Sequence, residues 1–240
     1  MNYTYSILLG LIILGLSSCS TCRYTAQPKE KTTAFEMQKT PCFGQCPVYN
    51  LFVFTDGTVL YEGLNFVEKK GLYTNVLSKK EYAQLCKTFH KARWNKLDST
   101  YTSELPDLAS TTITLYTKKG SKTVMGRDNI PEAFKQVEKV FTDIANKEKG
   151  WKPMPRGANL FNDWTPDQFI VKLTNETDLQ LLIDKYNKYD LKSLKRLAPD
   201  LNYWVLGFDV DKVSSAKFFY LLRQEAVISE IQYNRGVILR

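Results

Sequence analysis

Apolar side chains alternate along Thr40–Gly63 in a way that predicts two strands joined by a tight turn. In the first strand they fall on two faces: Tyr49, Leu51 and Val53 share one, and Phe52 and Phe54 share the other. Asp56-Gly57 separates the two alternating runs and is a strong hairpin signal, because both turn residues need positive φ. Since both faces carry large apolar residues, we expect a central strand buried on both sides.

The positions around this hairpin predict an α+β domain over residues 35–151. Strands are expected at 70–77, 110–116 and 122–126, and helices after the capping box Ser78-Lys79-Lys80-Glu81 and after Asn129-Ile130-Pro131-Glu132. Each helix carries an apolar stripe at helical spacing: Tyr82, Leu85, Phe89 and Ala92 in the first, and Phe134, Val137, Phe141 and Ile144 in the second. The pattern indicates an antiparallel sheet combined with two helices.

A second periodic pattern covers residues 167–240 and follows a Pro- and Gly-containing linker at 152–166. Its expected elements are, in chain order, a strand at 169–173, a helix at 177–189, strands at 191–197 and 203–208, a helix at 213–225 and a strand at 227–233. The order β-α-β-β-α-β is that of the split-βαβ or ferredoxin-like motif. The chain is therefore predicted to hold two α+β domains.

Composition and charge add little about function. The chain has 240 residues, of which 43% are hydrophobic and 24% charged, values that are ordinary for a folded globular protein. Its net charge of +8 is spread along the chain, and no basic stripe or RNA-binding signature is present. We therefore expect no nucleic-acid partner.

The N-terminus has the features of a targeting segment. Ile7–Leu16 is an uninterrupted apolar run, too short to span a bilayer but of the right length for a signal-peptide core. It ends in Leu16-Ser17-Ser18-Cys19, which resembles the lipobox of bacterial lipoproteins. The resemblance implies removal of residues 1–18 and lipid attachment to Cys19, and hence a membrane anchor. An ordinary secretory signal is the alternative.

The residues after Cys19 bear on the destination. In lipoprotein sorting, Asp after the lipidated cysteine favours retention in the inner membrane, whereas Ser20 follows here, so the resemblance implies the outer membrane. No acidic run of the kind that marks some surface-exported lipoproteins is present, and we expect the protein to face the periplasm, with the cell surface as the alternative. Residues 19–34 are polar and read as a tether.

The cysteine-containing motif Thr-Pro-Cys-Phe-Gly-x-Cys-Pro-Val-Tyr, with the Asp-Gly turn and the capped helix, resembles a domain of unknown function common in bacterial lipoproteins. The resemblance covers about Phe35–Trp151 and implies no known activity.

Cys42 and Cys46 are predicted to form a disulfide, because the cell envelope is oxidising and Gly44 gives the intervening turn the freedom to bring the two residues together. A redox site is one alternative, although the spacing is C-x-x-x-C and not C-x-x-C. A zinc site formed with Cys86 and His90 is another. Cys86 is more simply a small core residue, and the sequence assigns no partner to Cys22.

We expect no catalytic residue, metal or cofactor. His90 is the only histidine, and no nucleophile elbow accompanies it. A carboxylate pair of the glycosidase type stays open, because any sequence can supply two carboxylates.

Five segments of the second domain resemble the propeptide domain of secreted subtilisin-type serine proteases: 169–173, 194–197, 201–204, 231–234 and 237–240. In that family the domain assists folding of the protease and inhibits it, its sheet packing on the protease while its C-terminal tail lies in the substrate cleft. The resemblance implies that the tail residues bind a protease cleft by strand addition. These residues are Gly236, Val237, Ile238, Leu239 and Arg240.

Two hypotheses follow from these observations. The first is a lipid-anchored envelope binding protein, not an enzyme, whose second domain binds, inhibits or helps to fold a subtilisin-type protease. The second is an envelope scaffold or adhesion module with a protein or glycan partner. A metal-dependent or carboxylate enzyme in the first domain is a weaker third possibility.

Overall fold

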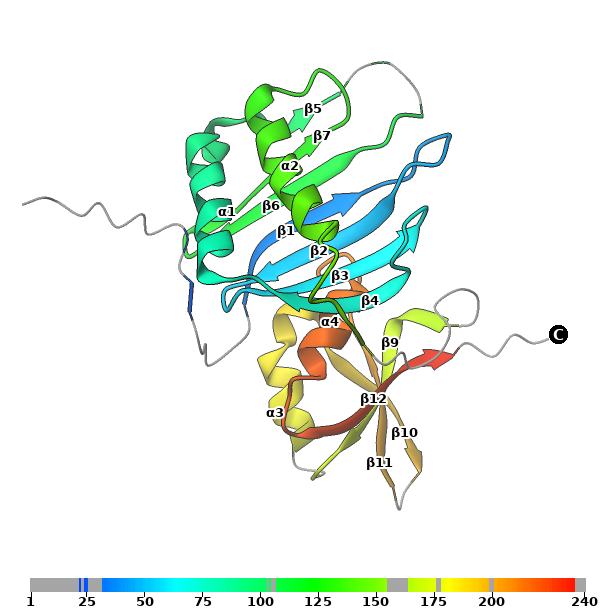
Figure 1. The fold of residues 1–240 in the computed structure, drawn as a ribbon. Coiled ribbons are helices and arrows are strands. Elements are labelled where there is room, and N and C mark those ends of the chain that lie inside the picture. Colours follow the sequence, from blue (N-terminus) through cyan, green and yellow to red (C-terminus); the bar gives the residue numbers. More distant parts are fainter. Residues whose placement is uncertain are drawn as a thin grey trace, which may run out of the picture.

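The protein, seen in a computed structural model, is described at Cys22, Tyr24, Thr25 and residues 32–102, 104, 107–154, 164–175, 178–198 and 201–235 (Figure 1). Over these ranges it is a mixed α+β fold with two β-sheets. The elements of the first part are β1 (Thr33–Lys39), β2 (Val48–Phe54), β3 (Thr58–Asn65), β4 (Gly71–Val76), α1 (Lys79–Lys91), η1 (Trp94–Lys96), β5 (Thr100–Tyr101), β6 (Thr111–Thr117), β7 (Gly120–Gly126), α2 (Glu132–Ala145) and β8 (Lys152–Pro153). Those of the second part are β9 (Trp164–Leu173), α3 (Asp178–Lys185), η2 (Asn187–Tyr189), β10 (Lys192–Ala198), β11 (Leu201–Gly207), α4 (Ser215–Leu222) and β12 (Ile228–Arg235).

The first sheet has the strand order β5-β7-β6-β1-β2-β3-β4-β8, so β2 lies in its interior as predicted. The predicted hairpin joins β2 to β3 and pairs Val53 with Val59. Gly57 adopts the left-handed conformation with φ +81°, but Asp56 does not. Its carboxylate instead accepts the N–H of Thr58 at 2.9 Å, and the N–H of Gly57 donates to the carbonyl of Phe54 at 2.9 Å. A side chain and the backbone together therefore hold the turn, where the sequence predicted positive φ at both residues.

Strand β1 was not predicted from the sequence. It begins at Thr33, two residues before the expected start of the domain, and lies between β2 and β6. Phe35 and Met37 face the helices and are fully buried, while Glu36 points to the opposite face. Only these few residues alternate, which is too short a run to distinguish a strand from a tether.

Helices α1 and α2 cover one face of the first sheet (Figure 1). The predicted capping box of α1 is present, since the N–H of Ser78 donates to Glu81 and the N–H of Glu81 donates to the Ser78 hydroxyl. The predicted cap of α2 was wrong, because Pro131 takes the N-cap position and no side chain caps it. Asn129 instead adopts φ +52° in the turn before the helix. The predicted apolar stripes of both helices are buried against the sheet.

The second sheet has the order β10-β11-β9-β12, and all its neighbouring strands are antiparallel. Strand β11 lies between β9 and β10, the two strands that α3 connects. The predicted order of strands and helices is therefore observed, with shifted ends: β9 begins at Trp164, and the first helix is divided into α3 and η2.

The two parts share a hydrophobic core. The face of the first sheet away from α1 and α2 carries Phe52, Phe54, Leu60 and Leu72, which belong to one cluster with the core of the second part. Helix α4 lies between the two sheets, and all eight of its residues are buried (Figure 1). Strand β2 is thus buried on both sides as predicted, and the second part supplies the second cover.

An ion pair within this shared core joins the two parts. Lys217 Nζ of α4 lies 3.1 Å from Glu36 Oε2 of β1, and both side chains are nearly inaccessible to solvent. The Tyr116 hydroxyl donates to the same carboxylate at 3.0 Å, and Lys217 Nζ lies 5.0 Å from the centre of the Tyr116 ring. Both partners are thereby satisfied, as buried charges must be.

Candidate functional site

The second sheet presents one face to the helices and one away from them. Phe169, Val171 and Leu173 of β9 are buried under α3 and α4, whereas Ile170 and Lys172 alternate with them and point to the opposite side. The register places Tyr203 and Glu230 on either side of Lys172. We call this side the open face, and define it by Ile170, Lys172, Tyr203, Glu230 and Gln232.

Polar side chains on the open face hold one another in place. Glu230 accepts a hydrogen bond from Lys172 Nζ at 3.0 Å and another from the Tyr203 hydroxyl at 2.8 Å. The bond to Glu230 raises the pKa of Lys172, and the bond from Lys172 lowers the pKa of Glu230. Because both groups are exposed, the pair contributes little to stability. It does give the face a fixed arrangement of charges and hydroxyl that a partner could recognise.

Apolar side chains lie beside this polar group. A hollow of about 740 Å³ along β12 is lined by Ile170, Tyr203 and Gln232 among others. The β10–β11 hairpin adds Leu194, Leu197 and Leu201, each exposed by more than two fifths. Of these three, Leu197 lines the same hollow as Tyr203 and Glu230, which places an exposed apolar side chain beside the ordered polar group.

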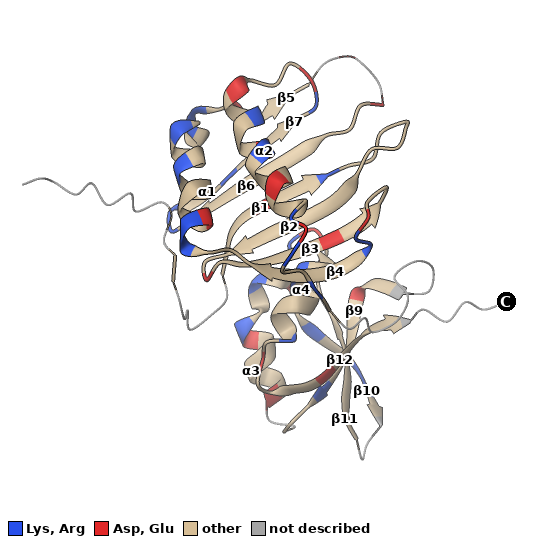
Figure 2. Cartoon of the chain, viewed as in Figure 1, with Lys and Arg blue, Asp and Glu red and all other residues tan. Residues whose placement is uncertain are grey.

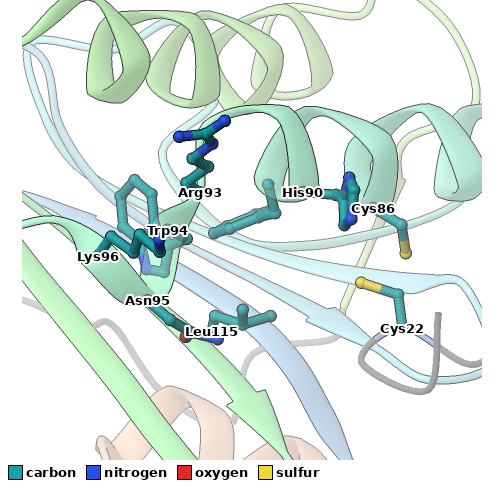
Figure 3. A pocket seen from close by; sticks show the side chains of 9 residues that line it. Cys22, Cys86, His90, Arg93, Trp94, Asn95, Lys96 and Leu115 are labelled. Carbon is teal, nitrogen blue, oxygen red and sulfur yellow. The ribbon is translucent and has the colours of Figure 1, made fainter.

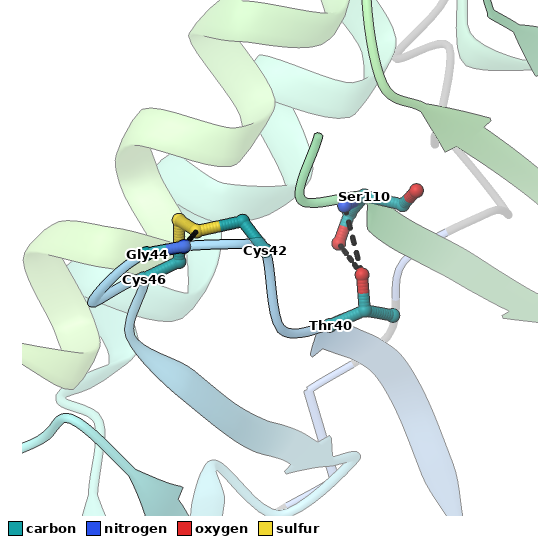
Figure 4. Close-up of a disulfide and its surroundings, with 5 residues drawn as sticks. All are labelled: Thr40, Cys42, Gly44, Cys46 and Ser110. Atoms are coloured by element: carbon teal, nitrogen blue, oxygen red, sulfur yellow. Dashed lines mark hydrogen bonds between the residues drawn. A yellow bond between two sulfur atoms is a disulfide. The ribbon is translucent and has the colours of Figure 1, made fainter. Parts of the chain in front are cut away.

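The disulfide lies in the loop between β1 and β2 (Figure 4). Cys42 and Cys46 have Cα atoms 5.7 Å apart, and their sulfur atoms are bonded. The loop is tied down at its start, where the N–H of Ser110 donates to the Thr40 hydroxyl at 2.8 Å. Between the cysteines, Phe43 is 92% exposed. The loop thus holds one aromatic side chain out in solvent at the start of the central strand.

A separate pocket of about 240 Å³ lies between α1, η1 and β6 (Figure 3). It is lined by Cys22, Cys86, Phe89, His90, Arg93, Trp94, Asn95, Lys96 and Leu115. Lys and Arg residues are frequent on the adjoining helix α1 (Figure 2). No carboxylate is among these lining residues, so His90 has no acidic partner there with which to form an acid–base pair.

The alternative zinc site is not assembled. Cys42 and Cys46 are bonded to each other in the β1–β2 loop, whereas Cys86 and His90 line the pocket beside α1. Within the described part of the chain, no three His, Cys, Asp or Glu side chains gather as a metal site would require. Of the four candidate zinc ligands, Cys86 and His90 therefore lie together beside Cys22, whereas Cys42 and Cys46 lie in the β1–β2 loop.

Several predicted site residues lie outside the described residues. They are Cys19, the predicted site of lipidation, and Gly236, Val237, Ile238, Leu239 and Arg240, the predicted partner-binding tail. The open face was missed in the sequence, although Lys172 interrupts an apolar run and Tyr203 opens another. No helix among the described residues is both long and apolar enough to cross a membrane.

Comparison with known proteins identifies only the first part of the chain. No curated protein and no solved structure matches the chain. Residues 33–145 match a family described as a domain of unknown function, DUF6438. The match begins with the first residue of β1 and ends with the last residue of α2. A DUF6438 domain of unknown function is therefore found at residues 33–145 of this chain.

Proposed function

We propose that this protein is a lipid-anchored binding protein of the cell envelope, and not an enzyme. In this proposal Cys19 carries the anchor in the outer membrane and the folded part faces the periplasm. The second part binds a subtilisin-type serine protease, which it inhibits or helps to fold. The observation that carries the proposal is the open face, because the first part covers helix α4 on one side of the second sheet, and the other side of that sheet carries exposed side chains.

The arrangement of the second part supports the propeptide-like assignment. Its elements follow the order β-α-β-β-α-β, and β11 lies between β9 and β10 with antiparallel neighbours throughout. This strand order is the one expected of the ferredoxin-like, split-βαβ arrangement that we propose. In the propeptide family the sheet packs on the protease, and here the side of the sheet that would do so is the open face.

The direction of the chain fits the same binding mode. Strand β12 is an edge strand of the second sheet and leads directly into residues 236–240. We propose that these residues enter the substrate cleft as an added strand while the open face contacts the protease beside it. A platform that is already folded against the first part presents such a tail with little loss of conformational entropy on binding.

A protease titration tests the proposal. The chain from Ser20 to Arg240 is added to a panel of subtilisin-type proteases, and the inhibition constant is compared with that of a chain ending at Arg235. We expect substrate-competitive inhibition that weakens by roughly 30-fold or more without the tail, since loss of a dominant contact removes at least about 2 kcal/mol. Tyr203→Ala on the open face should weaken inhibition by roughly 5-fold or more.

The matched control is Leu181→Ala. Leu181 is 68% exposed but lies on α3, on the helix side of the sheet, so this variant should inhibit like the unaltered chain. An inhibition constant that is unchanged by Tyr203→Ala would contradict a role for the open face. Absence of binding to every protease in the panel would overturn the protease proposal.

An envelope scaffold with a different protein or glycan partner is the second candidate. It is favoured by Phe43, which the disulfide loop holds out in solvent on the first part. A photo-crosslinking amino acid at position 43 should then capture one envelope component reproducibly, and the same group at Leu181 should not. Capture at neither position, together with protease inhibition, would eliminate this candidate.

A further inference from the structure

Tyr24 and Thr25, which precede β1, contact the first part of the fold. The Tyr24 ring packs edge-on against the Tyr82 ring of α1, with centroids 5.5 Å apart. Lys79 Nζ lies 5.9 Å from the centre of the Tyr24 ring, and the N–H of Thr25 donates to the carbonyl of Thr55 at 2.8 Å. These contacts fix the position of the chain beside α1 at the point where Cys22 occurs.

Cys22 and Cys86 face each other at this point (Figure 3). Their sulfur atoms point toward one another, one from the N-terminal segment and one from α1. Both side chains are half-buried and pack against the same hydrophobic core. The hydrogen bond with Cys86 lowers the pKa of the Cys22 thiol, although burial acts in the opposite direction. A lowered thiol pKa increases the thiolate fraction, which is the reactive species in disulfide exchange.

We infer that Cys22 and Cys86 form a second disulfide, which joins the N-terminal segment to α1. This inference rests on the proposed envelope location, because disulfides persist in oxidising compartments. The reaction is exchange with a disulfide oxidant such as oxidised glutathione. The Cys22 thiolate attacks one sulfur of the oxidant and releases one thiol. Cys86, deprotonated to solvent, then attacks the Cys22 sulfur and releases the second, so two protein thiols are oxidised and one external disulfide is reduced.

The two disulfides of the chain would have different roles. Cys42–Cys46 closes a short loop, with a sequence separation of 4. Cys22–Cys86 closes a long one and therefore constrains the unfolded chain more strongly. It would also shorten the tether. With the lipid on Cys19, only residues 19–22 would separate the anchor from the folded part, a reach of at most about 11 Å.

Peptide mapping of the unaltered chain is the direct test. The chain from Ser20 is oxidised with glutathione disulfide, remaining thiols are alkylated, and peptides are mapped without reduction. We expect one cross-linked peptide pair containing Cys22 and Cys86, besides the Cys42–Cys46 peptide. Alkylation of both Cys22 and Cys86 under these conditions, or linkage of either to Cys42 or Cys46, would overturn the inference.

Thermal unfolding gives a second, independent readout. The oxidised chain should unfold at a temperature higher by about 10 °C than the same chain with Cys22→Ser, as expected for a long closed loop. Cys86→Ser and the double variant should lose the same amount, because either change removes one bond. The matched control, Cys42→Ser with Cys46→Ser, should leave the Cys22–Cys86 cross-link in place. Equal unfolding temperatures of the oxidised chain and Cys22→Ser would count against the bond. Loss of protease inhibition alone would bear on the proposed function and not on this disulfide.

Discussion

The two faces of the first sheet are buried in different ways. The near face packs against α1 and α2, and every element in contact there comes from residues 22–151. The far face packs against α4 and the rest of the second part. The two charged side chains among the buried residues of the described chain, Glu62 and Lys217, both belong to the far side. Elements of the same part of the chain cover the near face by apolar packing. The far face is covered by a segment distant in the sequence, and buried charged side chains lie in that contact.

This difference indicates how the two parts are matched to each other. Apolar surface alone would fit many partners, whereas a buried charge fits only where its counter-ion is provided. Glu36 and Lys217 meet in one position of α4 on the sheet. We therefore interpret the far face as a specific interface between two parts of one chain, and not as a general hydrophobic surface.

The strongest challenge to this comparison is to remove the far cover altogether. In residues 22–154 alone, Phe52, Phe54, Leu60 and Leu72 would lose their partners. Exposing four large apolar side chains costs about 6–12 kcal/mol at 1.5–3 kcal/mol each, which is comparable to the stability of a whole domain. We expect this fragment to bind a hydrophobic dye and to show no cooperative thermal transition.

Co-expression of 22–154 with 164–240 as separate chains is the matched control. The interface between them is non-covalent, so the two pieces should co-purify and regain a cooperative transition. A fragment 22–154 that is monomeric and has the amide-exchange protection of the full chain would show that the far face needs no cover.

A smaller effect is expected from the ion pair. Glu36→Gln leaves the Lys217 ammonium buried without its counter-ion and should lower the free energy of unfolding by about 3–5 kcal/mol, measured by urea denaturation. Glu36→Gln combined with Lys217→Met removes both charges and should cost clearly less than the single change.

The matched control for this pair is Lys139→Met. Lys139 and Asp143 lie 2.7 Å apart on α2, but their side chains are 74% and 60% exposed, so the loss should stay within about 1 kcal/mol. Equal effects of Glu36→Gln and Lys139→Met would mean that the far-face pair has no special role.

Much of the near side could be predicted from the sequence, because its signals are local. The Asp56-Gly57 turn, the Ser78 capping box and the two apolar stripes each lie within a few residues. For the far side, the sequence predicts that a second face is buried but not which element covers it. Phe52 and Phe54 indicated a second buried face, but no local signal says which distant helix covers it. Lys217 in particular would be expected on the solvent-facing side of its helix, because lysine is rarely fully buried unless it is paired.

The candidate site shows the same division. The Cys42–Cys46 pairing depends on a short spacing, so the sequence alone suggests it. The open face depends on which side of the second sheet the helices occupy, and the Cys22–Cys86 approach depends on where the N-terminal segment lies. Both are consequences of tertiary packing, and no local sequence pattern predicts which distant residues come together.

The smallest expected effect concerns Glu62 and is a dependence on pH. Glu62 is buried on the far face of β3, where Asn50 Nδ2 donates to its carboxylate at 2.8 Å. Burial raises the pKa of Glu62 above its ordinary value of 4.5, outweighing the opposite effect of Asn50. At Glu62 the folded chain therefore keeps its proton to a higher pH than the unfolded chain does, so this group makes the stability fall as pH rises above 4.5.

Glu62→Gln keeps the acceptor for Asn50 and removes the charge. We expect it to be more stable than the unaltered chain at pH 8, with the difference shrinking as pH falls toward 4.5. Urea denaturation at a series of pH values measures this difference. The pKa of Glu81 is lowered to about 2, chiefly by a hydrogen bond from Lys147, so its contribution to stability rises with pH. This contribution cancels in the comparison because both chains contain Glu81. A difference that does not vary with pH, or a less stable variant at pH 8, would mean that the far face holds Glu62 without a desolvation cost and that the two faces differ less than their burial indicates.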